Sequence, residues 1–376
     1  MFLLDRLIKV QLEKLRSSGL YRDKIVTANM LNFSRNDYLA LTDNKKLHKA
    51  YQRGYALYPC GSSGSPVICG YHAAHQELEQ FFAQQLNADA GMLFTSGYAA
   101  NLAIVALLQS LSAYLLIDKY IHASIYDGIK LVNAQYKRYL HNNIQNLANI
   151  SHSLAPQQNL VVLTEGIFSM SGSIAALDQI AILCQELQMP CIVDESHSFG
   201  IIGKHGLGTV ELFRLTQDLI PLRIISFGKA LGAQGAIVIG NKNWLNALLQ
   251  HARGYIYSTA MSPAVAYGIL TAVQLAYDAD DQRVYLQDLI TYFRECCSQY
   301  SYVWRDSISP IQQLQLGCPY KARQLSQYLL SHNIICYAIR QPTVTLKNTG
   351  LRIVLNCRHT QSDIDLLFNK LQQFYA

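Results

Sequence analysis

Lys229 is the residue whose type and surroundings point most directly to covalent chemistry. It lies in the segment SFGKALG, flanked by small or apolar residues, and it is the only lysine between Lys204 and Lys242. A lysine in a dry, glycine-lined turn can act as the neutral amine that forms a Schiff base with a carbonyl. The alternative is an ordinary exposed loop lysine, and Lys229 taken alone favours that alternative.

Asp194 supplies a second group that fits this chemistry. It ends the apolar run CIVD. A carboxylate in that place either caps a following helix or holds a buried cation. The cation that suits a Schiff-base lysine is the protonated pyridine nitrogen of pyridoxal 5′-phosphate (PLP), whose ring needs an acidic partner to act as an electron sink. Lys229 and Asp194 together therefore indicate a PLP site.

A phosphate group would need a helix N-terminus and hydroxyl groups. Ser96, Gly97 and Tyr98 precede an apolar helical stretch, where free backbone N–H groups and a glycine allow close approach of an anion. Ser226 adds a hydroxyl one turn before the lysine. Without the lysine and the aspartate, the same residues would indicate only helix capping.

Two histidines and a glutamate follow other apolar runs. His122, in DKYIHASIYDG, could stack on a flat ring, and His197 could hydrogen-bond a phenolic oxygen. Glu165 ends the run VVLTE, and Ser169 follows four residues later. A structural role is the alternative for each histidine.

Other catalytic patterns fail. The segment GKHGLG (203–208) lacks the spacing of a dinucleotide fingerprint, and no GxxxxGK[ST] loop occurs. The segment GSSGS (61–65) is not a hydrolase nucleophile elbow, and His72 and His75 lack the HExxH spacing of a zinc protease. We expect no metal site.

Alternating strands and helices must position these side chains. We expect helices at 75–86, 98–111 and 177–187, and strands at 91–94, 113–118, 159–165, 189–195, 223–227 and 235–240. Such alternation predicts an α/β fold, a mostly parallel sheet with helices on both faces. Ligands then bind at the carboxyl ends of the strands, where the polar residues above lie.

The organisation predicted along the chain has three parts. Residues 1–44 form an N-terminal amphipathic helix, ending at Ser17-Ser18-Gly19, and an extended segment. Residues 45–265 form a large PLP-binding α/β domain. Residues 266–376 form a smaller C-terminal α+β domain.

Composition limits the possible partners and location. The chain has 376 residues, 50% of them hydrophobic and 15% charged, with a net charge of +6. So little charge favours self-association, and no dense Lys/Arg stripe indicates nucleic acid. The nine cysteines form no C-x-x-C pair and favour free thiols. No secretory signal or membrane span is evident, so we expect a cytoplasmic protein.

An ordered series of motifs resembles the α-oxoamine synthases, PLP enzymes of aminotransferase fold type I. The motifs are NFSRNDYLAL, TSGYAANLAI, DKYIHASIYDG, TEGIFSMSGSIAAL, IVDESHSFG, SFGKALGAQGA, YIYSTAMSPA and IRQPTV…LRIVLN, spread over residues 30–360. The sequence departs from the family at Pro66, in place of a basic residue, and at Ser196, in place of alanine.

The resemblance implies a role for each matching residue. Lys229 would form the Schiff base, Asp194 would pair with the pyridinium, and His197 with the phenolic oxygen. His122 would stack on the ring. The cofactor's other contacts would come from Ser96, Gly97, Tyr98, Ser169 and Ser226, with Thr259 reaching the phosphate of a neighbouring subunit. Substrate would contact Arg22, Asn36, Thr343 and Arg352.

The resemblance also implies a reaction and an assembly. The best match is to members that condense L-alanine with pimeloyl-CoA or a pimeloyl-acyl carrier protein, with loss of CO2, to give 8-amino-7-oxononanoate in biotin biosynthesis. A homodimer is implied. Three alternatives stay open: a glycine-using member of the 2-amino-3-ketobutyrate CoA ligase or 5-aminolevulinate synthase type, a simple aminotransferase, and a non-catalytic subunit.

Overall fold

The computed structural model describes residues 2–26, 30–154 and 159–375. The chain divides into two compact units. Unit 1 comprises residues 1–36, 170–173 and 285–376, and unit 2 comprises residues 37–169 and 174–284. The division at residues 44 and 265 inferred from the sequence stays a prediction.

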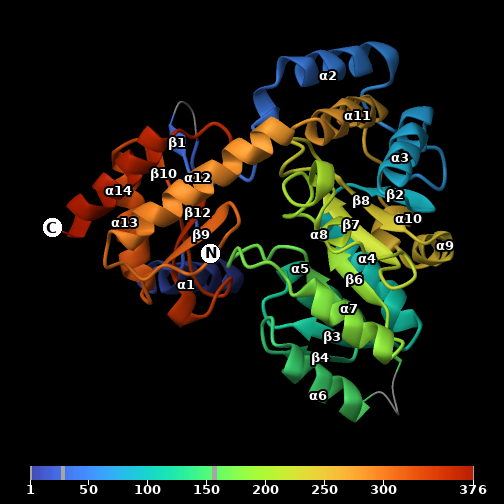
Figure 1. Cartoon of the computed structure of the whole chain (residues 1–376), viewed down its shortest axis with the longest axis horizontal. Helices are drawn as coiled ribbons and strands as arrows, with labels where there is room; N and C mark the ends of the chain where they lie inside the picture. Colours follow the sequence, from blue (N-terminus) through green and yellow to red (C-terminus); the bar gives the residue numbers. More distant parts are fainter. Residues whose placement is uncertain (1, 27–29, 155–158, 376) are drawn as a thin grey trace. The chain divides into compact units, whose positions relative to one another are not determined.

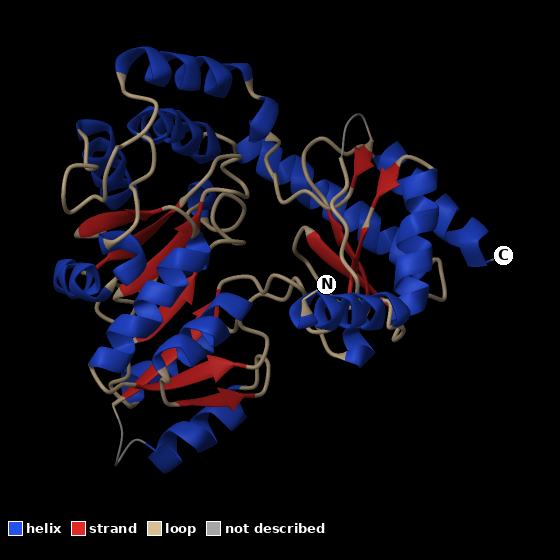
Figure 2. Ribbon diagram, turned by 180° about the vertical axis from the view of Figure 1, so that it is seen from behind, coloured by secondary structure: helices blue, strands red, loops and turns tan. Residues whose placement is uncertain are grey.

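A seven-stranded sheet forms the centre of unit 2, and Figure 2 shows it with helices packed on it. The strand order is β2-β8-β7-β6-β5-β3-β4, and only β8 runs antiparallel to its neighbours. The expected mostly parallel α/β sheet is therefore confirmed. The strands are β2 (Ala90–Phe94), β3 (Tyr114–Asp118), β4 (Tyr136–Tyr139), β5 (Leu160–Glu165), β6 (Cys191–Asp194), β7 (Leu222–Ser226) and β8 (Ala236–Gly240).

Helices cover both faces of this sheet because successive strand residues point to opposite faces. Along β5, Val161 and Leu163 join one buried cluster, whereas Val162 joins the other. The first cluster includes residues of α4 (Gly97–Ser110), α5 (Ala123–Val132), α9 (Lys242–His251) and α10 (Arg253–Ile256); the second includes residues of α6 (Ile144–Leu154), α7 (Leu177–Glu186) and α8 (Thr209–Leu212).

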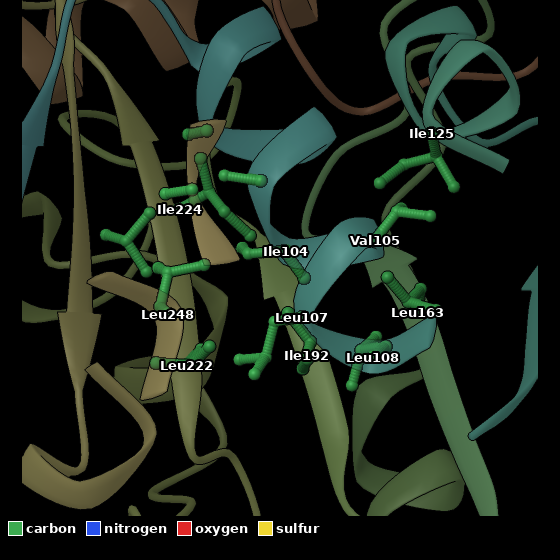
Figure 3. Close-up of a cluster of buried hydrophobic side chains, with 14 of the residues drawn as sticks. Ile104, Val105, Leu107, Leu108, Ile125, Leu163, Ile192, Leu222, Ile224 and Leu248 are labelled. Carbon is green, nitrogen blue, oxygen red and sulfur yellow. The ribbon is translucent and has the colours of Figure 1, made fainter. Parts of the chain in front are cut away.

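Helix α4 is held against the central sheet by buried side chains. Its residues Ile104, Leu107 and Leu108 are fully buried, and Figure 3 shows them over Ile192 of β6 and Leu222 of β7. Burying each such side chain stabilises the fold by about 1.5–3 kcal/mol. The packing therefore holds the N-terminus of α4 at the carboxyl ends of the strands.

Unit 2 also contains elements outside these two clusters (Figure 1). They are η1 (Leu41–Asp43), α2 (Lys45–Leu57), α3 (Ala73–Gln85), η2 (Lys204–Gly206) and α11 (Pro263–Tyr277). Helix α11 packs against α2 and α3.

Unit 1 is built around a small antiparallel sheet with the order β11-β12-β9. A short parallel pair joins β1 to β10, which brings the start of the chain beside its C-terminal part. The elements are α1 (Leu3–Ser17), β1 (Leu31–Asn32), α12 (Asp280–Ser298, from Tyr285 on), β9 (Ile311–Gln315), α13 (Pro319–Ser331), β10 (Ile334–Ile335), β11 (Tyr337–Ile339), η3 (Leu346–Asn348), β12 (Gly350–Val354) and α14 (Gln361–Tyr375).

The six strands expected from apolar runs are all present, and strand β4 was missed. Its sequence YKRY is exposed apart from Tyr139, so it lacks the apolar signal of a buried strand. All nine cysteines are free, as expected, but Cys60 and Cys69 are exposed. Among the helices formed by described residues, none is both long and apolar enough to cross a membrane.

Candidate active site

The carboxyl ends of the parallel strands gather the polar residues in unit 2. Asp194 ends β6, and its Oδ2 accepts a hydrogen bond from Asn101 Nδ2 at 2.9 Å. Its Oδ1 accepts from the backbone N–H of Ser196, also at 2.9 Å. Two donors from different elements therefore fix the position of the Asp194 carboxyl group.

Lys229 lies three residues beyond β7 in the tight turn that leads to β8. Its carbonyl accepts a hydrogen bond from Gly232 N–H at 2.9 Å, and its side chain is partly buried. Lys229 and Asp194 both act electrostatically on His122 and on Glu165. The lysine and the aspartate, predicted separately from two strand ends, are therefore in one electrostatic neighbourhood.

His122 caps the start of α5 and belongs to the same cluster. Its Nδ1 lies 2.8 Å from Ser124 Oγ, which also accepts from Asn101 Nδ2 at 2.9 Å. Burial lowers the pKa of His122; nearby Asp194 opposes this shift and Lys229 adds to it. Asn101 therefore donates hydrogen bonds both to Ser124, the partner of His122, and to Asp194.

His197 is buried and held by a tyrosine. Its Nδ1 lies 2.7 Å from the hydroxyl of Tyr38, which is fully buried although it is 159 positions away in the chain. The hydroxyl fixes the plane of the imidazole, which orients its other ring nitrogen, Nε2.

Glu165 is a buried acid at the end of β5. Its Oε2 accepts a hydrogen bond from Ser169 N–H at 3.2 Å, whereas no partner among the described residues reaches Oε1. Burial, followed by the charge of Asp194, raises the pKa of Glu165 well above its usual value, and Lys229 opposes the shift. Burial therefore favours the neutral form of this carboxyl group.

The N-terminus of α4 forms an anion-binding corner beside β7. Ser96 caps the helix by accepting from Ala99 N–H at 3.1 Å. A Cβ built on Gly97 would lie 3.4 Å from Ser226 Cβ, so the two segments approach closely. Ser226 N–H donates to Ser196 Oγ at 3.2 Å. The Ser196 hydroxyl, at the position where the resembling family has alanine, therefore links the residues that follow β6 to the end of β7.

Tyr98 and Thr259 lie at the surface of this unit. Tyr98 is 44% exposed, and its hydroxyl donates to Asp127 at 2.5 Å. Thr259 is exposed and lines a small cavity with Thr95 and Glu79.

In unit 1, Arg352 lies in the middle of β12 and is 9% exposed. Its Nη2 donates to Asn36 Oδ1 at 3.0 Å. Arg352, Arg22 and Thr343 line one cavity of about 480 Å3. The structure therefore brings the four expected substrate residues together within this unit.

The cluster in unit 2 fits PLP. It offers an amine, a carboxyl group, two imidazoles and a helix N-terminus, which are the groups that an aldehyde, a pyridinium, a ring and a phosphate require. Two buried atoms, Asn101 Oδ1 and Glu165 Oε1, have no hydrogen-bond partner among the described residues. Such orphaned atoms are typical of a site that a ligand completes.

Sequence reasoning missed the residues that support this cluster. Asn101 is the one polar side chain in the apolar run NLAIVALL, a signal that could have marked it. Tyr38 and Ser124 carry no such signal, because their partners are set by the tertiary fold.

Comparisons with known proteins agree with this site. The family model described as aminotransferase class I and II matches residues 28–371. An 8-amino-7-oxononanoate synthase from Thioalkalivibrio sulfidiphilus is 34% identical over 378 residues, which cover 97% of this chain and 96% of the relative. The solved 8-amino-7-oxononanoate synthase from Francisella tularensis is 34% identical with a TM-score of 0.80, over 93% of this chain and 99% of that chain.

A more distant structure shows the fold alone. A serine palmitoyltransferase from S. paucimobilis, solved with a PLP–myriocin aldimine, has a TM-score of 0.90 at 24% identity, over 99% of this chain and 98% of that chain. The sheet, the cluster and these likenesses define a PLP-dependent enzyme of fold type I. The chain belongs to the aminotransferase class I and II family and, within it, to the α-oxoamine synthases, and it is a PLP-dependent acyltransferase.

Proposed function

We propose that this enzyme condenses L-alanine with a pimeloyl thioester to give 8-amino-7-oxononanoate, CO2 and the free thiol, a step of biotin biosynthesis. The substrates are those implied by the named relatives, which match nearly the whole chain. The observation that carries the chemistry is the cluster of Lys229, Asp194 and His122 at the strand ends. A site lacking the lysine would favour a non-catalytic subunit instead.

The residues of unit 2 hold the cofactor in this proposal. Bound PLP withdraws electrons from the α-carbon of the amino acid, which makes loss of its proton possible. Asp194 would keep the ring nitrogen protonated, and His122 would pack against the ring. His197 donates from Nε2 to the phenolic oxygen, because its Nδ1 is engaged by Tyr38.

Further contacts surround the phosphate and the ring. Gly97 and Tyr98 contribute backbone N–H groups, and Ser96 and Ser226 contribute hydroxyls. Ser169 lies beside the cofactor. In the homodimer that we propose, Thr259 reaches the phosphate in the neighbouring subunit.

Lys229 carries the proton steps. Its Nζ would take the proton from the α-carbon of alanine and would return a proton to the product after CO2 has left. Arg352 binds the alanine carboxylate through its two N–H groups, and Asn36 orients that guanidinium. These hydrogen bonds would hold the α-carbon of alanine in one orientation for removal of its proton. Arg22 and Thr343 contact the acyl substrate.

The test is mass spectrometry of the product formed by the holoenzyme from L-alanine and pimeloyl-CoA. We expect 8-amino-7-oxononanoate, and none from the Lys229→Ala variant. The product of glycine, and not of alanine, would instead assign a glycine-using member of the family. Pyruvate formed from alanine with a keto-acid acceptor would assign an aminotransferase.

A further inference from the structure

A cavity of about 480 Å3 lies within unit 1 and is lined by four arginines. Its volume is in the range of sites that bind small molecules. The arginines are Arg22, Arg35, Arg340 and Arg352, and among the described residues of the lining Asp23 is the one carboxylate. The excess of cationic groups indicates a ligand with more than one negative charge, or two anionic ligands together.

Two of these arginines are engaged by the protein. Arg340 is buried, and its Nη1 donates to the carbonyls of Gly19 and Tyr21. Arg352 donates to Asn36 and binds the amino-acid carboxylate in the proposed function.

Arg22 and Arg35 differ from Arg340 and Arg352 in their hydrogen bonding. Within the part of the chain that the structure describes, neither guanidinium has a hydrogen bond or an ion pair. Arg35 is nevertheless half-buried, and it directly precedes Asn36. A partly buried guanidinium that no protein group satisfies is poised to bind an anion from outside.

Part of the remaining lining is apolar and part is polar. The apolar residues are Ile25, Met170, Ile335, Ala338 and Ile339, and the polar ones are Asn32, Ser34, Tyr337 and Thr343. An apolar wall suits a methylene chain, and the guanidinium groups suit a carboxylate at the end of that chain. The wall and the charges together describe an aliphatic chain with an anionic end.

We infer that Arg35, together with Arg22, binds the terminal carboxylate of the acyl chain and makes the enzyme selective for dicarboxylic acyl groups. This inference rests on the proposed function, because it assumes an acyl thioester as the second substrate. The carrier's phosphates are another source of the same anionic chemistry, and the experiment separates the two sources.

The experiment compares holoenzyme variants on three thioesters with L-alanine. Pimeloyl-CoA has both anionic groups, monomethyl pimeloyl-CoA lacks the terminal charge, and pimeloyl-N-acetylcysteamine lacks the phosphates. We expect Arg35→Gln to lower kcat/KM by about tenfold or more for the two substrates with a terminal carboxylate, and by less than about twofold for the methyl ester. Arg35→Lys keeps the charge but loses the forked geometry, so it should restore part of the loss.

Arg6→Gln is the matched control, since Arg6 is an exposed arginine of α1 outside the cavity. It should leave all three values unchanged. An equal loss on all three substrates in Arg35→Gln would overturn the inference, as would a loss confined to the CoA thioesters.

Failure of the proposed function gives a different result. In that case the wild-type holoenzyme forms no product from any of the three thioesters. The inference is then tested by calorimetric titration of pimeloyl-N-acetylcysteamine. Binding that is weakened by Arg35→Gln and not by Arg6→Gln supports the carboxylate site, and binding equal in all three proteins contradicts it.

Discussion

Glu79 makes the stability of this protein depend on pH in a way that can be calculated. It lies on α3, is 9% exposed, and accepts hydrogen bonds from the Tyr71 hydroxyl at 2.6 Å and from Leu93 N–H at 2.8 Å. Burial raises the pKa of Glu79 from 4.5 to about 7, and the two hydrogen bonds only partly offset this effect.

The sign of the effect follows from proton binding. Between pH 4.5 and about 7 the folded state keeps the proton that the unfolded state has released, so the free energy of unfolding falls as pH rises. The loss is complete above the folded pKa. At 1.36 kcal/mol per pH unit, the rise in pKa corresponds to about 3 kcal/mol.

Glu79→Gln removes this titration, and urea unfolding from pH 4 to pH 8 measures the result. The unfolding free energy of the wild type minus that of the variant should fall by about 3 kcal/mol across this range. Glu77→Gln, an exposed neighbour on α3, is the control and should give a difference that does not change with pH. A flat difference for Glu79→Gln, or one that rises with pH, would contradict a raised pKa of Glu79 in the folded state.

Three further predictions concern the cofactor site and the helix cap and turn near it. Asp194→Ala should leave the purified protein with much less PLP, because the ring nitrogen loses its acidic partner; alkaline release and absorbance measure the content, and wild-type occupancy would contradict the role. Ser96→Ala removes the cap of α4 and should lower the unfolding free energy by about 1 kcal/mol in urea, whereas no change would show that the Ala99 N–H finds another acceptor. Gly208→Ala should destabilise the folded protein by more than about 1 kcal/mol, because φ at this position is +97° and a Cβ would lie 2.7 Å from the Glu195 carboxylate. Thermal unfolding measures this effect. A variant that unfolds at the same temperature as the wild type would contradict the expected strain.

The central sheet could be predicted from the sequence because its strands are buried on both faces. Runs such as VVLTE and CIVD have few alternatives to a parallel strand, and each ends in a residue of the site. The rule that ligands bind at the carboxyl ends of such strands then brought Asp194 and Lys229 into one place. These predictions depend on local patterns, which a single sequence contains.

The supporting contacts could not be predicted because they join distant parts of the chain. Tyr38 meets His197 across 159 positions, and Asn101 meets Asp194 across 93. The arginine cavity is assembled from three separate pieces of unit 1, of which Met170 comes from a segment of only four residues. No periodicity or spacing in the sequence indicates these long-range contacts.

The covalent attachment of PLP to Lys229 is the claim on which the other roles depend. The most direct measurement is borohydride reduction of the purified holoenzyme, followed by proteolysis and mass spectrometry of the labelled peptide. The account predicts a pyridoxyl-phosphate adduct on the peptide that contains SFGKALG, at Lys229, and no adduct in the Lys229→Ala variant. An adduct on another lysine, or reduction that leaves no adduct at all, would contradict it.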